Sequence, residues 1–207
     1  MLKGDTAVNE NLSEMQKKGK TLEDAIKFAT DAHAGVKRKG KNRAYILHPL
    51  EAMIIAASLT DDEEVLAAAV LHDTVEDTDV TKAQLEREFG SRVADLVAAE
   101  SEDKRVGTPA AETWELRKQE TIDHLFNASR EAKLICLGDK LANLRELARD
   151  HAKIGDALWA RFNQKDKTKH AWYYRSVLEI LKKEFGAVPA TVEYAGLLSE
   201  LFGKESD

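Results

Sequence analysis

The stretch that most constrains both fold and chemistry reads Leu66-Ala-Ala-Ala-Val-Leu-His-Asp-Thr-Val-Glu-Asp-Thr78. Six apolar residues lead directly into His72 and Asp73, and Glu76 and Asp77 follow within about one helical turn. Buried polar groups without partners are strongly unfavourable, so an imidazole beside a carboxylate at the end of an apolar helix needs compensation. A divalent metal ion is one way to satisfy both groups.

Length and composition predict a globular chain that can bury a core, since its 207 residues are 43% hydrophobic and 33% charged. The formal net charge of −6 argues against a general nucleic-acid-binding protein. The single cysteine, Cys136, rules out an internal disulfide framework and fits a reducing, cytoplasmic location. No run approaches the ~18 apolar residues of a membrane span. We expect no nucleic-acid or membrane partner, and the oligomeric state stays open.

The apolar residues recur with helical spacing, and β-branched alternation is too scarce to predict a sheet. We expect an all-α fold, a single helical bundle at residues 21–203 that follows a flexible N-terminal arm at residues 1–20. Side-chain caps and glycine or proline stop signals set the expected boundaries. With caps included, the expected helices cover residues 21–35, 49–60, 61–72, 81–90, 91–100, 112–127, 130–150, 168–185 and 191–202.

Four side chains are candidate metal ligands: His48, His72, Asp73 and Asp139. His48 stands at a helix start, where its ring can turn inward. Asp139 follows an apolar turn, and a carboxylate in such surroundings should be protonated, paired or bound to a cation. Two imidazoles and two carboxylates suit Mn²⁺, Fe²⁺ or Zn²⁺, and the oxygen content favours Mn²⁺.

Each of these residues also has a purely structural interpretation. His48 could cap a helix, and His72 could be a core histidine whose hydrogen bonds are satisfied. Asp139 could pair with Lys140 or Arg145. The prediction therefore depends on the combination of residues rather than on any one of them.

A basic loop over residues 36–44 precedes His48 and places five positive charges in seven residues. A solvated loop is the usual explanation of such a run, but this position also suits it to nucleotide phosphates and bases. Glu76 and Asp77 lie four residues after His72 and Asp73, so in a continuous helix each acid shares a face with a candidate ligand. Alternatively, the two acids begin a solvated turn.

These motifs carry a family resemblance. The segments concerned are His33-Ala-Gly35, Arg38-Lys-Gly40, Tyr45-Ile-Leu-His-Pro-Leu50, Leu71-His-Asp-Thr-Val-Glu-Asp-Thr78, Phe89-Gly90 and Gly138-Asp-Lys-Leu-Ala-Asn143. In order and spacing they resemble the hydrolase domain of the RelA/SpoT family, and more narrowly the stand-alone small alarmone hydrolases within the HD-domain phosphohydrolases. The resemblance implies a helical HD-domain bundle, one Mn²⁺ ion, and removal of the 3′-pyrophosphate from guanosine tetra- or pentaphosphate, (p)ppGpp, by metal-activated water.

The same resemblance implies residue roles by motif position. The metal ligands would be His48, His72, Asp73 and Asp139, and the catalytic acids Glu76 and Asp77. The guanine nucleotide would be bound by Arg38, Lys39 and Asn143, with Lys140 a further candidate for its phosphates. Because 207 residues leave no room for the synthetase domain of long family members, hydrolysis without synthesis is expected.

Two alternative functions stay open. The same metal site could hydrolyse another phosphate monoester, such as a deoxynucleoside monophosphate or the 2′-phosphate of NADPH. The chain could also bind alarmone without hydrolysing it. The family's common Val-Thr pair is replaced in the stretch at residues 96–101, which puts one pocket wall in doubt. Three aromatic-basic clusters, at residues 113–118, 159–165 and 170–175, resemble the C-terminal half of some stand-alone bacterial members. We expect their aromatic residues to pack between helices, namely Trp114, Trp159, Phe162, Trp172 and Tyr173.

Overall fold

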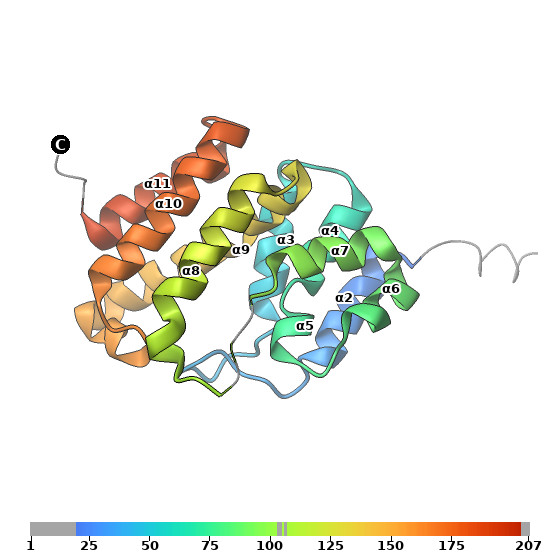
Figure 1. Ribbon diagram of the computed structural model, residues 1–207, viewed down its shortest axis with the longest axis horizontal. Coiled ribbons are helices and arrows are strands. Elements are labelled where there is room, and N and C mark those ends of the chain that lie inside the picture. Colours follow the sequence, from blue (N-terminus) through green and yellow to red (C-terminus); the bar gives the residue numbers. More distant parts are fainter. Residues whose placement is uncertain (1–19, 103–104, 106, 204–207) are drawn as a thin grey trace, which may run out of the picture.

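The computed structural model describes residues 20–102, 105 and 107–203, and these residues form a bundle of helices (Figure 1). An isolated bridge joins Lys37 to Ala44, and no strand is formed within the described ranges. The all-α class is therefore confirmed. In chain order the helices are α2 (Leu22–Ala32), α3 (Leu47–Ala57), α4 (Glu63–Leu71), α5 (Thr74–Asp77), α6 (Lys82–Phe89), α7 (Ser91–Glu100), α8 (Ala110–Asn127), α9 (Arg130–Ile154), the 3₁₀ helix η1 (Gly155–Arg161), α10 (Lys167–Phe185) and α11 (Pro189–Phe202).

Side-chain caps begin several helices where the sequence predicts them. Thr21 accepts a hydrogen bond from the backbone N–H of Asp24, whose carboxylate accepts one in return from the backbone N–H of Thr21. Asp62 and Thr81 cap α4 and α6 with their side chains, which accept hydrogen bonds from backbone N–H groups of the first turn. The expected N-terminal arm lies, apart from Lys20, outside the described residues.

Helix α4 does not continue through the acidic pair as one helix. It ends at Leu71, and the short helix α5 begins at Thr74. The Thr74 hydroxyl donates to the carbonyl oxygen of Leu71 over 2.7 Å, and the ring of His72 bonds the carbonyl oxygen of Ala69 over 2.8 Å. Side chains thus bind carbonyl groups at the end of α4, which favours termination of the helix there.

Helices α3 and α9 lie at the junction of two hydrophobic cores. One core is built mainly from α8, α9, η1, α10 and α11, and the other from α2, α4, α6, α7 and the first turns of α9. Figure 1 shows α10 and α11 at one end of the molecule and α2 and α6 at the other, with α3 and α9 between them. Side chains from both halves can therefore meet along α9.

Gly138 sets the approach of these two central helices. A side-chain carbon at position 138 of α9 would lie 2.5 Å from the carbonyl oxygen of Ala52 on α3. Such a distance is far inside van der Waals contact, and backbone cannot turn aside as a flexible side chain can. Since α3 carries His48 and α9 carries Asp139, this glycine controls the spacing of two candidate ligands.

We expect Gly138→Val to lower the free energy of unfolding by about 1–3 kcal/mol, because the added carbons force α3 and α9 apart. Denaturant unfolding measures the change. Gly196→Val in α11 is the matched control, since a side-chain carbon there would meet no atom within 4 Å. Valine has the higher helix propensity, so the control should be at least as stable as the parent chain. Equal stability of the two variants would show that Gly138 does not limit how closely α3 and α9 pack.

Candidate metal and substrate site

The four candidate ligands come from separate elements and meet at the junction of the two cores. His48 lies in the first turn of α3 and His72 directly follows α4. Asp73 directly precedes α5, and Asp139 lies near the middle of α9. Residues separated by as many as 91 positions in the sequence (139 − 48) therefore share one site.

The two carboxylates approach both imidazoles closely. Asp139 Oδ1 lies 3.0 Å from His48 Nε2 and 3.6 Å from His72 Nε2. Asp73 Oδ2 lies 3.5 Å and 3.2 Å from the same two nitrogens. Ligand atoms of His48, His72 and Asp139 all lie within 4.8 Å of one another, and all three residues are buried. This is the spacing of groups that can share one ion.

His72 shows that the cluster suits a cation. Its Nδ1 donates to the carbonyl oxygen of Ala69, so Nε2 is the nitrogen that faces the two carboxylates and can bind a proton or a metal ion. This Nε2 is buried without a hydrogen-bond partner. Burial alone would lower the pKa of His72, but the charges of Asp73 and Asp139 raise that pKa well above its usual value. The site therefore attracts positive charge, which a divalent metal supplies.

Asp139 is held ionised by its neighbours. Burial would raise its pKa, but the adjacent Lys140 and the two nearby imidazoles hold the pKa well below the usual carboxyl value. Lys140 Nζ pairs with Oδ2, and Asn143 Nδ2 donates to Oδ1 over 2.6 Å. Of the two pairing partners that the sequence left open, Lys140 is the one observed, because Arg145 pairs with Glu193 instead.

Tyr45 links the ligand cluster to the acidic pair, a role that the sequence motifs did not predict. Its hydroxyl lies 2.8 Å from Asp73 Oδ2 and 2.6 Å from Asp77 Oδ2. Burial, followed by the charges of these two carboxylates, raises the pKa of the Tyr45 hydroxyl, so it stays protonated and can donate. Glu76 Oε2 accepts a bond of 3.3 Å from the backbone N–H of Glu102. Both acids lie on α5, which directly follows the candidate ligand Asp73.

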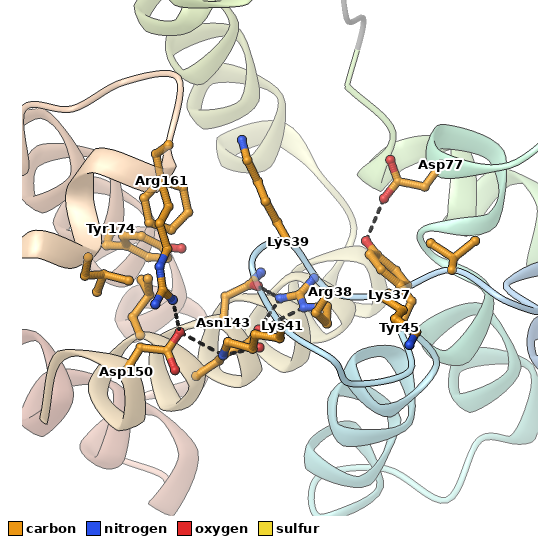
Figure 2. Close-up of a pocket in the computed structure, with 15 residues that line it drawn as sticks. Lys37, Arg38, Lys39, Lys41, Tyr45, Asp77, Asn143, Asp150, Arg161 and Tyr174 are labelled. Atoms are coloured by element: carbon orange, nitrogen blue, oxygen red, sulfur yellow. Dashed lines mark hydrogen bonds and ion pairs between the residues drawn. The ribbon is translucent and has the colours of Figure 1, made fainter. Parts of the chain in front are cut away.

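A cavity of about 640 Å³ adjoins this cluster (Figure 2). Its lining includes three of the four predicted nucleotide-binding residues, Arg38, Lys39 and Asn143, together with Asp77. Lys140 does not line this cavity and lies instead against Asp139. A volume of this size is in the range of small-molecule sites and exceeds what a pyrophosphate alone would fill.

The basic loop is fixed to α9 by charge. Arg38 donates from Nε to Glu146 over 2.9 Å and from Nη2 to Asn143 over 2.8 Å. Lys41 Nζ lies 2.6 Å from Glu146 and 2.8 Å from Asp150. Burial would raise the pKa of Glu146, but the bonds from Arg38 and Lys41 lower it to about 2. The loop is therefore a wall of the cavity rather than a freely solvated segment.

Two parts of the chain that depart from the family motifs or lie outside them can be located in the structure. The stretch at residues 96–101, which lacks the family's Val-Thr pair, includes Glu100 at the end of α7. Burial raises the pKa of the Glu100 carboxyl to about 7. The expected packing of Trp114, Trp159 and Tyr173 is confirmed, since all three are buried in one core. Phe162 packs against that core and also lines the cavity.

Comparisons with known proteins give a consistent result. The model of the HD domain family matches residues 25–168. The chain is 40% identical over 131 residues to the guanosine-3′,5′-bis(diphosphate) 3′-pyrophosphohydrolase MESH1 of Danio rerio, covering 62% of this chain and 69% of that protein. It is 41% identical over 132 residues to MESH1 of Homo sapiens, covering 62% and 70%.

Solved structures agree with these matches. One is described as a metazoan ortholog of SpoT that hydrolyses ppGpp and plays a role in starvation responses; it has a TM-score of 0.72 at 26% identity, covering 88% of this chain and 96% of that one. A protein from Listeria monocytogenes EGD-e has a TM-score of 0.66 at 32% identity, covering 76% and 99%. The HD-domain arrangement of the helices is thereby confirmed.

Proposed function

Since this chain belongs to the HD domain family, we propose that it hydrolyses the 3′-pyrophosphate of guanosine tetra- or pentaphosphate. The observation that carries this function is the buried group of His48, His72 and Asp139, with the half-buried Asp73 beside it, near a cavity walled by the basic loop. Relatives of similar sequence are named for this same activity. The products would be GDP or GTP and pyrophosphate.

His48, His72, Asp73 and Asp139 would hold one divalent ion, and Mn²⁺ fits a donor set that is half carboxylate. When bound, such an ion makes water a stronger nucleophile near neutral pH and neutralises phosphate charge. The unpartnered Nε2 of His72 supports this assignment, because a ligand bond would satisfy it.

Glu76 and Asp77 would orient the attacking water and take its proton. Tyr45 holds Asp77 beside Asp73, which places one of these acids next to the ligand cluster. Water attacks the phosphorus that is bonded to the 3′ oxygen, the bond between that phosphorus and oxygen breaks, and the released 3′ oxygen takes up a proton. Arg38, Lys39 and Asn143 would bind the nucleotide from the cavity wall, and Lys140 would bind phosphate beside Asp139.

The reaction product separates this function from its alternatives. With Mn²⁺ present, we expect ppGpp to yield GDP and pyrophosphate, as measured by nucleotide separation and a pyrophosphate assay. Release of inorganic phosphate from NADPH or a deoxynucleoside monophosphate, with ppGpp left intact, would instead favour a different phosphomonoesterase. Saturable ppGpp binding without any turnover would favour an alarmone-binding module.

No helix in the described part of the chain has the length and apolar character needed to cross a membrane. Cys136 is a buried, unpaired thiol, as a reducing compartment permits. We therefore propose that the protein acts in the cytoplasm, where guanine nucleotides are present.

A further inference from the structure

The substrate cavity has two chemically different ends. Tyr45 and Asp77 lie at one side, next to the metal ligands, and Arg161 and Tyr174 lie at the opposite side (Figure 2). Lys39 projects between them. The second end includes Arg161 of η1, the following residue Phe162, and Tyr174 of α10, which belong to the aromatic-basic clusters rather than to the motif segments that carry the RelA/SpoT resemblance.

Arg161 is fixed at this second end by two separate elements. Its Nη1 donates to Asp150 Oδ2 of α9 over 3.1 Å, and Asp150 also pairs with Lys41. Along the basic loop, a side-chain carbon at Gly40 would lie 3.5 Å from Arg161 Cδ. Arg161 therefore joins η1 to both α9 and the basic loop, and its side chain remains 34% exposed towards a ligand.

The cavity lining carries more positive than negative charge, which favours the binding of an anion. The cavity is lined by five cationic side chains, whereas Asp77 at the reactive end, Glu146 and Asp150 are its carboxylates. Lys37 lies beside Tyr45 at the reactive end (Figure 2), so away from Asp77 the carboxylates Glu146 and Asp150 face four cations, which are Arg38, Lys39, Lys41 and Arg161. A guanidinium carries five N–H donors, and the bond to Asp150 uses Nη1, so the group can also take a phosphate.

We propose that Arg161 binds the 5′-phosphates of the nucleotide and makes the enzyme selective for substrates phosphorylated at both ends. This inference rests on the proposed function, which places the 3′-pyrophosphate at the metal cluster. A ribose with a phosphate chain on each of two oxygens then needs a second cationic region, and the end of the cavity away from Asp77 provides it. Arg161 is a specificity-determining residue for this reaction.

Paired substrates test the proposal. For Arg161→Gln we expect KM for ppGpp to rise about 10- to 100-fold, the range for a lost charge-assisted hydrogen bond, with kcat nearly unchanged. KM for guanosine 3′-diphosphate, which has no 5′-phosphate, should stay the same. Arg161→Lys, which keeps the charge but loses the planar fork, should fall between the parent and Arg161→Gln. Equal effects on both substrates, or none on either, would overturn the proposal.

Lys167→Gln is the matched control. Lys167 begins α10, is 33% exposed like Arg161, and pairs with Asp156 of η1 over 2.8 Å, but it does not line the cavity. Its removal therefore also breaks an ion pair of η1, and it should leave KM for both substrates unchanged. A thermal unfolding midpoint for each variant shows whether the fold has been kept.

A binding measurement distinguishes failure of this inference from failure of the proposed function. GDP carries the 5′-diphosphate but lacks the 3′ group, and its affinity can be measured by calorimetry without turnover. Weaker GDP binding by Arg161→Gln, with guanosine binding unchanged, supports the role of Arg161 even if the parent chain releases no pyrophosphate from ppGpp. Unchanged GDP affinity overturns that role even if the parent chain is an active hydrolase.

Discussion

Replacing Asp139 with asparagine should lower the affinity for the activating metal by more than about 100-fold and abolish pyrophosphate release. Changes to residues that merely support metal ligands already cost about 10- to 100-fold, so the loss of a ligand charge should cost more. The amide keeps the size of the side chain but removes the negative charge that pairs with Lys140 and faces both imidazoles. Metal titration measures the affinity for the ion, and a pyrophosphate-release assay on the same samples measures the activity.

Asp95→Asn is the control for this substitution. Asp95 is an exposed carboxylate of α7 that pairs with Lys82 and lies far from the candidate ligands in the sequence. Its loss should change neither metal affinity nor turnover, because exposed ion pairs contribute little. Retention of full activity by Asp139→Asn would remove Asp139 from the proposed site.

The second large effect is expected for Glu76→Gln, which should lower kcat by about 10²- to 10⁴-fold while the metal stays bound. Glutamine retains an oxygen that can accept the backbone bond from Glu102, so the local fold should be kept. It cannot take a proton from the attacking water. Single-turnover kinetics, together with the metal content of the same sample, separates this chemical defect from a loss of metal.

Glu86→Gln serves as the comparison, because Glu86 is an exposed glutamate of the neighbouring helix α6. It should behave like the parent chain. If Glu76→Gln and the parent hydrolysed ppGpp at equal rates, the catalytic assignment of Glu76 would be wrong, and Asp77 would be the remaining acid of the pair. If Glu76→Gln lost the metal instead, Glu76 would belong to the ligand set.

Local signals predicted the helices well because caps act over a few residues. Thr21 and Asp62 begin α2 and α4 through hydrogen bonds to backbone groups two or three positions away. The end of α4 was predicted at His72, which is its C-cap, but the separate short helix α5 was not predicted, since it follows from bonds of His72 and Thr74 to carbonyl groups of α4. The 3₁₀ helix η1, after α9 ends at Ile154, was not predicted.

The candidate site was predictable only in part, for a related reason. Motif order indicated that His48, His72 and Asp139 belong together, and the structure brings them together. Nothing in the local sequence states which other side chains converge on them. Tyr45 bridges Asp73 and Asp77, and Arg161 closes the far end of the cavity, through contacts that depend on how α3, α5, α9 and η1 pack.

The central claim is that one divalent ion, held by side chains from positions 48, 72, 73 and 139, is required for hydrolysis. Its most direct test is to strip the protein with a chelator, add Mn²⁺ in increments, and follow metal content and pyrophosphate release from ppGpp together. The account predicts no release from the stripped protein and recovery that saturates at one equivalent of ion per chain. Full hydrolysis by protein shown to contain no metal would contradict it.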